Sequence, residues 1–578
     1  MDKRIFGKNG RRTVLVVLSF IICHLTSIPA VAQNHNLEVA KNLEIFNALY
    51  SQLDLFYVDS LSPGQTMTAG IKGMLRSLDP YTEYYPEEET KQLEMMLTGK
   101  YAGIGALVKY HTALKRVVVD EPYEGMPAAE AGVKKGDIIL SIDDSVMTDK
   151  AVSYVSSHLR GDPGTTFVLK VHRPTTDKDM TFKITRRNIK LPEMPYYGLS
   201  ADSIGYINFN QFTEGSAKEV RRAFVELKKQ GARGMVLDLR SNGGGAEMEA
   251  VDLVNIWVPQ EQMVVENRGK IRQASRSYTT RLEPVDTVMP LVVLVNGETA
   301  SASEITSGAL QDLDRAVVMG TRTYGKGLVQ VPMDLPYNTN VKITTSKYYI
   351  PSGRCIQAIN YAKQRESTTT NRNGRSSSLY ADRTPDSLTH VFYTRNGREV
   401  RDGGGIKPDL EVKNDTMPNI AYYLSTGGLD STEVLFDYVV YYLEHHPQIA
   451  PAKEFHLTDQ DWQEFRQRVI DSGFTYDDQS RKQFDELVKT AKFEGYYDDA
   501  REAFDALGQR LKHDLATELD KHRDAIQEVL ELDIIAANYY QAGSIAAGLA
   551  YDKVYQEAAK LLKDTKRYHE ILKHEREL

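Results

Sequence analysis

Three polar residues in the middle of the chain have the types and the order that covalent hydrolytic catalysis needs. They are Ser301, Lys326 and Gln330. A serine hydroxyl is a weak nucleophile until a base removes its proton, and a lysine can act as that base when burial lowers the pKa of its ammonium group. The sequence therefore suggests a Ser–Lys pair, a chemistry that requires no metal and no organic cofactor.

The segments around Ser301 predict the backbone that would present its hydroxyl. Residues 291–295 form an apolar, β-branched run that is typical of a buried strand, and the Asn-Gly pair after them signals a turn. Residues 300–313 then repeat apolar side chains at helical spacing. Ser301 would begin this helix, where the amide of Ala302 and the positive end of the helix dipole favour a developing oxyanion.

The segment around Lys326 also has features of a catalytic site. Gly325 and Gly327 flank the lysine and allow the backbone to pack closely around it. Lys326 and Gln330 are separated by an even number of positions, which predicts that both lie on one face of a strand.

A structural interpretation of the same residues is also available. Ser301 and Glu304 match the Ser-x-x-Glu capping box, in which the serine hydroxyl binds a helix amide and takes no part in chemistry. A single lysine is usually a solvated surface residue. The combination of N-G-x-x-A-S-A-S-E with a later T-x-G-K-G-x-x-Q favours the catalytic interpretation.

Composition places the chain among ordinary globular proteins with several domains. Its 578 residues are too many for one hydrophobic core, which predicts about three or four domains. The formal net charge is −8, so the chain lacks the excess of positive charge that is typical of nucleic-acid-binding proteins, and we expect no nucleic-acid partner. Cys23 and Cys355 are the two cysteines, and neither lies in a catalytic cysteine signature.

The first 32 residues have the pattern of a signal peptide. A basic stretch precedes a short apolar run, and the small residues before Gln33 predict cleavage after Ala32. Ile22 before Cys23 is too bulky for a lipobox, so lipidation is not expected. We therefore expect an exported protein that is soluble in the periplasm or cell envelope of a bacterium. Residues 33–95 follow with helical periodicity.

Residues 96–186 resemble a PDZ domain, a module that binds the free C-termini of proteins. The block P-A-A-E-A-G-V-K-K-G-D-I-I at residues 127–139 matches the PDZ signature of short helix, turn and strand. A captured tail would add to the sheet edge, and backbone amides would hold its carboxylate. The loop that resembles the carboxylate-binding loop contains Gly103, Ile104, Gly105 and Ala106.

Taken together, these motifs resemble those of the carboxyl-terminal processing peptidases, or tail-specific proteases, of family S41. The resemblance covers roughly residues 40 to 412. It implies that Ser301 is the nucleophile, that Lys326 is the general base and that Gln330 orients the lysine. The family pattern D-L-R-x-N-x-G-G begins at residue 238. By resemblance, Gly243 or Gly244 in this pattern supplies a second oxyanion amide beside Ala302.

The resemblance also implies the architecture of the remaining chain. Alternating strands and helices predict an α/β core at residues 187–412, and the family implies a crotonase-like fold for it. Residues 361–390 form a Ser/Thr/Asn/Arg-rich insertion within this core, expected to be a loop. Residues 413–578 show helical patterns throughout and predict an all-α extension. Such extensions are compatible with homo-oligomer contacts or with an envelope-associated adaptor.

The expected function is endoproteolysis of exported proteins near their C-termini, after the PDZ domain has captured the tail. Two other functions fit parts of the sequence. A non-catalytic PDZ scaffold would be favoured by loss of Ser301 or Lys326, and both are present. A small-molecule acyl hydrolase would not need a module that holds protein tails.

Overall fold

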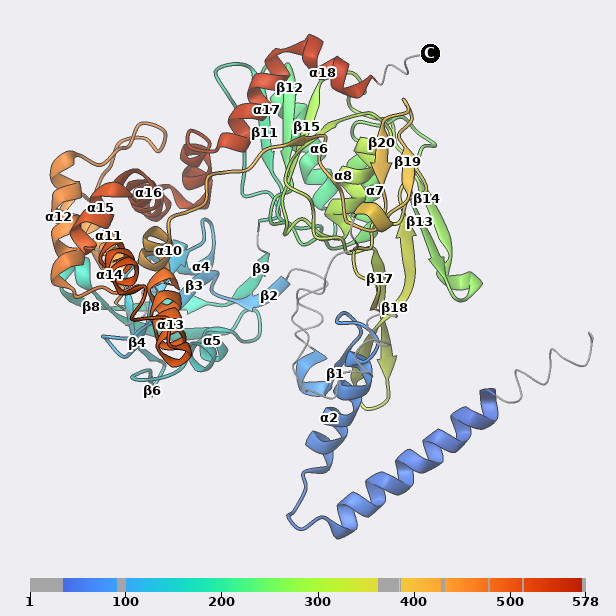
Figure 1. Ribbon diagram of the computed structural model, residues 1–578, viewed down its shortest axis with the longest axis horizontal. Coiled ribbons are helices and arrows are strands. Elements are labelled where there is room, and N and C mark those ends of the chain that lie inside the picture. The colour runs from blue at the N-terminus through green and yellow to red at the C-terminus, as the bar shows by residue number, and fades with distance from the viewer. Residues whose placement is uncertain are drawn as a thin grey trace, which may run out of the picture. The chain divides into compact units, whose positions relative to one another are not determined.

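The computed structural model describes most of the chain after residue 34 (Figure 1). The described residues are 35–90, 100–190, 192–361, 384, 386–427, 432–476, 479–511 and 514–573. The predicted signal peptide and most of the predicted insertion lie outside these residues. The chain divides into two compact units, Met1–Pro86 and Glu87–Leu578. In the described part of the chain, no helix has the length and apolar content needed to cross a lipid bilayer.

The first unit consists of helices and one turn. Residues 35–56 are helical, as the periodicity predicts, and α2 spans Pro63–Arg76 with its proline in the first turn. β1 (Glu83–Tyr85) follows. In the turn between them, the Asp79 carboxylate accepts hydrogen bonds from the amides of Tyr81 and Thr82, both at 2.8 Å. Asp79 is therefore a turn-forming residue, as expected before proline.

The PDZ module contains the first sheet of the second unit. Its strands pair in the order β3-β4-β5-β7-β8, with β6 (Ser145–Val146) beside β5, and they enclose an apolar core with α4 and α5. The bounds are β3 Ala106–His111, β4 Arg116–Pro122, α4 Pro127–Ala131, β5 Ile138–Ile142, α5 Val152–Leu159, β7 Thr166–Arg173 and β8 Lys178–Thr185. The strands β2 (Lys100–Gly103) and β9 (Arg187–Lys190) pair separately. Because β3 lies at the end of the sheet order, it is an edge strand.

A six-stranded sheet forms the centre of the α/β core. Its order is β10-β11-β12-β15-β16-β21, and all pairs are parallel except β10 with β11. The bounds are β10 Tyr196–Leu199, β11 Ile204–Asn208, β12 Gly234–Asp238, β15 Leu291–Val295, β16 Val317–Gly320 and β21 Leu410–Glu411. The four inner strands, β11, β12, β15 and β16, are buried on both faces, which explains their largely apolar sequences.

Helices from distant parts of the sequence cover the two faces of this sheet. Three helices pack on one face with alternate strand residues: α6 Ser216–Lys229, α7 Glu247–Val254 and α8 Ala302–Asp312. The other strand residues pack against two C-terminal helices, α17 Lys553–Lys563 and α18 Thr565–Leu572. In Figure 1, α17 and α18 lie on the opposite side of β11, β12 and β15 from α6 and α8. The end of the chain therefore completes the second layer of the core.

A second, antiparallel sheet belongs to the same core. In it β14, β13, β18 and β17 pair in this order. The bounds are β13 Met263–Gly269, β14 Arg276–Thr279, β17 Leu328–Leu335 and β18 Thr339–Tyr349. A small hairpin of β19 (Val391–Tyr393) and β20 (Glu399–Arg401) follows.

Most of the remaining helices form a separate apolar cluster, and α11 also contacts the PDZ sheet. The cluster contains α10 Asn419–Thr426, α11 Val434–His445, α12 Asp459–Asp471, α15 Leu515–Lys521 and α16 Arg523–Gly548. The helices α13 Gln479–Glu494 and α14 Arg501–Arg510 lie outside it. The helical pattern that starts at residue 420 contains a break: helix α10 ends before Gly427, a left-handed residue, and α11 starts at Val434. On α11, Phe436 and Val440 pack against Val118 of the PDZ sheet.

Candidate active site

Ser301 lies at a sharp turn between a buried strand and a buried helix. It follows β15 and is the N-cap residue of α8, with φ 57° and ψ −118°. A residue other than glycine rarely adopts this conformation, and such strain often marks a functional position. The Ser301 amide donates to the Glu304 carboxylate at 2.9 Å, and this bond is part of a capping box between the two residues. The capping box explains the pairing of Ser301 with Glu304 but not the unusual backbone conformation of Ser301.

Glu304 connects the backbone of Ser301 to the backbone of Lys326. One carboxylate oxygen accepts from the amides of Ser301 at 2.9 Å and Lys326 at 2.8 Å. The other accepts from the amide of Gly325 at 2.7 Å and from the hydroxyl of Thr323. Glu304 is fully buried, and this burial raises its pKa, although the four donors oppose the rise. The two segments that carry the predicted nucleophile and base are thus joined by one side chain.

A buried tyrosine makes a second connection between these segments. The Tyr348 hydroxyl donates to the Lys326 carbonyl, and the Tyr348 side chain also hydrogen-bonds the side chain of Ser301. Burial holds the pKa of Tyr348 well above its usual value, so this phenol stays neutral. Beyond Lys326, the Gly327 amide donates to the Gln357 side chain at 2.7 Å. Gly327 has no room for a side chain, because a Cβ would lie 2.7 Å from the Gln357 nitrogen.

Lys326 and Gln330 do not share a strand. Lys326 precedes β17, which begins at Leu328, and the register of β17 shifts between Val329 and Gln330. The expectation that even spacing keeps both on one strand face is therefore wrong, because a β-bulge changes the alternation. Gln330 donates to the Thr344 hydroxyl at 3.2 Å.

The glycine loop after β12 packs against the start of α8. A Cβ on Gly244 would lie 2.8 Å from both the Ser301 Cβ and the Ala302 nitrogen, so only glycine fits there. The Asn242 carbonyl accepts from the Ala300 amide at 3.0 Å and from the Ser303 hydroxyl at 2.9 Å. These contacts fix the loop beside Ser301.

The two predicted oxyanion glycines differ in what their amides do. The Gly244 amide donates to the Asn242 side chain at 2.9 Å. Within the described residues, the amides of Gly243 and Ala302 donate to no other group. Gly243 is exposed and Ala302 is the first residue of α8. Gly243 and Ala302 are therefore the amides that remain available to an oxyanion.

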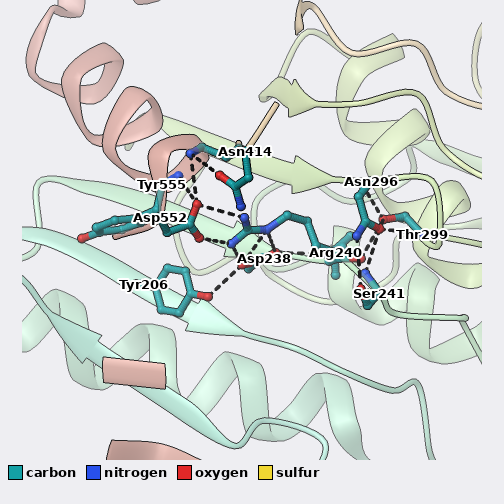
Figure 2. Close-up of polar contacts among 11 residues, drawn as sticks. Tyr206, Asp238, Arg240, Ser241, Asn296, Thr299, Asn414, Asp552 and Tyr555 are labelled. Atoms are coloured by element: carbon teal, nitrogen blue, oxygen red, sulfur yellow. Dashed lines mark hydrogen bonds and ion pairs between the residues drawn. The ribbon is translucent and has the colours of Figure 1, made fainter. Parts of the chain in front are cut away.

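An ion-paired arginine begins the same loop (Figure 2). The Arg240 guanidinium donates to both oxygens of Asp238, with Nε at 2.9 and 3.1 Å, and also to both oxygens of Asp552. Burial alone would lower the pKa of Arg240, but the two carboxylates raise it above its usual value. The Tyr206 hydroxyl completes the group by donating to Asp238 at 2.8 Å. Asp238 and Arg240 therefore hold the start of the loop.

The predicted tail-binding loop lies at the start of the edge strand of the PDZ sheet. The carbonyls of Ile104 and Gly105 accept from Ala128 and Tyr123, each at 2.9 Å. Among the described residues, the amides of Ile104 and Gly105 have no hydrogen-bond acceptor. Ala106 begins β3, and α5 packs beside this strand. Free amides next to an unpaired strand edge are the features that β-augmentation requires.

Sequence reasoning missed three residues that contribute to this arrangement. Glu304 carried a signal, the capping box, but that motif does not reveal its bonds to Gly325 and Lys326. Tyr348 appears only as one of the alternating residues of a strand. Asp552 is 312 residues from Arg240, and its sequence signal is that of an ordinary helix cap. No three His, Cys, Asp or Glu side chains of the described chain gather as a metal site.

Three family models match separate parts of the chain. Peptidase family S41 matches residues 203–364, a PDZ domain matches residues 118–173, and the C-terminal helical domain of a probable PDZ-protease matches residues 425–562. These matches confirm the expected fold class, an α/β peptidase core with a PDZ domain and an all-α extension.

Known proteins resemble parts of the chain. A carboxy-terminal-processing protease of Bartonella bacilliformis is 33% identical over 334 residues, covering 57% of this chain and 76% of that protein. The corresponding protease of a Picosynechococcus species is 37% identical over 278 residues, covering 47% and 66%. Among solved structures, the photosystem II D1 C-terminal processing protease is 26% identical, covers 64% and 93%, and has a TM-score of 0.35. The chain belongs to the carboxyl-terminal-processing peptidases of family S41 and is a serine-type endopeptidase.

Proposed function

We propose that the enzyme cleaves exported proteins near their C-termini with Ser301 as nucleophile and Lys326 as general base. Neutral Lys326 would accept the hydroxyl proton as Ser301 attacks the scissile carbonyl. The protonated lysine would then give this proton to the leaving amine, which leaves an acyl-enzyme on Ser301. A water molecule, deprotonated by the same lysine, would release the new C-terminus. Gln330 is proposed to orient the lysine during these transfers.

The observation that carries this proposal is the shared carboxylate of Glu304. Its Oε2 binds the backbone of both Ser301 and Lys326, so the nucleophile and the base come from segments held at one point. The strained backbone of Ser301 supports the same assignment.

Two backbone amides are proposed as the oxyanion donors. Ala302 begins α8, where the helix dipole favours negative charge, and Gly243 lies in the loop that packs against it. Loss of one oxyanion donor typically costs about 3 kcal/mol of transition-state stabilisation. The position of the glycine loop is therefore expected to control the turnover number.

The PDZ domain is proposed to select substrates by their free C-termini. The tail would pair with the edge of β3, and the amides of the loop at residues 103–106 would hold its carboxylate. The leader at residues 1–32 supports export of the enzyme and hence substrates outside the cytoplasm. Protein substrates with free C-termini are the proposed partners.

An unfolded model protein made with a free and with an amidated C-terminus tests this proposal. Amidation removes the carboxylate charge but leaves the scissile segment unchanged, so we expect kcat/KM to fall by at least tenfold. Mass spectrometry of the products measures both rates and locates the cleaved bonds. Equal cleavage of the two substrates would leave a protease without tail sensing, and it would refute the proposed role of the PDZ loop.

A further inference from the structure

The C-terminal extension contributes a side chain to the loop beside the nucleophile. Asp552, the N-cap residue of α17, binds Arg240 with both carboxylate oxygens, and Nη1 lies 3.1 Å from Oδ1. Figure 2 shows the Arg240 guanidinium between Asp238 on one side and Asp552 on the other. The residue that opens the proposed catalytic glycine loop is thus held by two carboxylates, one at the end of β12 and one in the C-terminal extension.

This ion pair differs from an ordinary surface pair in burial and in geometry. The side chains of Arg240, Asp238 and Asp552 are 17%, 3% and 14% exposed. A bidentate arginine–carboxylate pair fixes the direction of the guanidinium as well as its position. Removing one carboxylate from a buried pair also leaves the arginine partly uncompensated, which favours its reorientation.

Asp552 is itself held rigidly. It accepts from the amides of Val554 at 3.0 Å and Tyr555 at 3.1 Å, which caps α17. The Tyr555 ring packs edge-on against Tyr206 with centroids 5.3 Å apart, and Tyr206 donates to Asp238. The start of α17 is therefore fixed to the strands that carry the loop.

The loop that Arg240 opens reaches the proposed oxyanion site within three residues. Ser241 has a positive φ of 58°, so the chain turns sharply there before Gly243. The Arg240 amide also donates to Asp238 at 3.0 Å, which couples its backbone to the same carboxylate as its side chain. Movement of the Arg240 side chain would therefore shift the start of the loop.

We propose that Asp552 is a positioning residue for the reaction at Ser301. It holds Arg240, and through Arg240 it fixes the loop that presents the Gly243 amide to the oxyanion. This inference rests on the proposed function, because it assumes that the Gly243 amide stabilises the transition state. It also assigns a task to the C-terminal helical segment: this segment completes the peptidase site.

The test compares the same substitution at two helix caps. In Asp552→Asn the amide oxygen still caps α17, because asparagine is as good an N-cap as aspartate, but the negative charge facing Arg240 is lost. Asp564→Asn is the matched control, since Asp564 caps α18 by accepting from the Arg567 amide at 3.0 Å. We expect Asp552→Asn to lower kcat about tenfold with KM unchanged, and Asp564→Asn to leave kcat within twofold of wild type.

Two further measurements separate positioning from general loss of structure. A peptide boronic acid forms a tetrahedral adduct on the nucleophile and places an oxygen in the oxyanion site. Its inhibition constant should weaken about tenfold in Asp552→Asn, whereas the affinity for a non-cleavable tail peptide should not change. In an Arg240→Ala background, the added Asp552→Asn substitution should cause no further loss, because the two residues act in series.

Three outcomes would overturn the proposal. The first is a kcat for Asp552→Asn equal to that of the control. The second is a loss of kcat that adds to the loss caused by Arg240→Ala. The third is a loss of kcat in Asp552→Asn that is accompanied by an equal loss of affinity for the tail peptide. Ser301→Ala, assayed in the same experiment, distinguishes failure of the proposed function from failure of the positioning role of Asp552. If Ser301→Ala still cleaves, the proposed function fails. If Ser301→Ala is inactive while Asp552→Asn behaves as wild type, only the positioning role fails.

Discussion

At the scale of single residues, the site depends on the buried carboxylate of Glu304. Four donors from the nucleophile turn and the lysine loop satisfy Glu304. Burial raises the pKa of this carboxyl, and the hydrogen bonds from its four donors oppose the rise. The capping box in the sequence thus marks a side chain that orders two catalytic segments.

Replacement of this carboxylate should therefore disturb both segments. In Glu304→Gln the new amide group turns hydrogens toward at least one of the four donors, and each donor left unpaired costs about 1–3 kcal/mol. We expect a lower Tm and a loss of kcat/KM of about a hundredfold, measured by calorimetry and by peptide cleavage. Glu298→Gln, an exposed position in the same turn, serves as the control and should change neither value. Full activity of Glu304→Gln would show that the carboxylate does not organise the site.

At the scale of elements, the sequence predicts the parts that follow simple periodicity. The strand before Ser301, the helix after it and the helix at residues 35–56 lie where apolar spacing places them. The prediction that Lys326 and Gln330 share a strand face is wrong, because the register shift before Gln330 breaks the alternation of side chains along the strand. The packing of α17 on the sheet was not predictable, since an amphipathic pattern shows that a face is buried but not what covers it.

The contact between strand β4 and helix α16 offers a pH test at this scale. Glu121 on β4 has a buried carboxylate oxygen with no hydrogen-bond partner among the described residues. Burial raises its pKa above the usual 4.5, Lys135 opposes the rise, and Asp120 and Asp533 add to it. Lys135 itself pairs with Asp120 and Asp533, each at 2.9 Å. The ionised Glu121 is therefore an unfavourable charge at this contact.

The sign of the effect follows from the raised pKa. The folded state holds the Glu121 proton more tightly than the unfolded chain does. The free energy of unfolding therefore falls as the pH rises through the folded pKa of Glu121. Glu121→Gln should raise Tm on the order of 1–4 °C at pH 8, and the gain should disappear below about pH 4.5, where the carboxyl is protonated in both states. Glu124→Gln in the exposed turn nearby is the control. A Glu121→Gln protein that is less stable at pH 8 would contradict this account.

At the scale of the whole second unit, the C-terminal helical segment contacts both functional modules. Asp533 in the first half of α16 pairs with Lys135 in the turn before β5 of the PDZ domain, and Asp552 after α16 pairs with Arg240 of the glycine loop. Between them, Tyr540 interrupts the helix with φ 56° and ψ −173°. The sequence predicts the helical character of this segment, but contacts between residues so far apart depend on tertiary packing that local patterns do not contain.

The most direct test of the central claim is to trap the acyl-enzyme. Wild type, Ser301→Ala, Lys326→Ala and Ser307→Ala would each be mixed with a peptide ester, quenched in acid and mapped by mass spectrometry. Ser307 is a buried serine later in α8 and serves as the control. The Ser–Lys mechanism predicts an acyl adduct on Ser301 in wild type and Ser307→Ala, and none in the other two variants. An adduct on another residue, or turnover by Ser301→Ala, would contradict it.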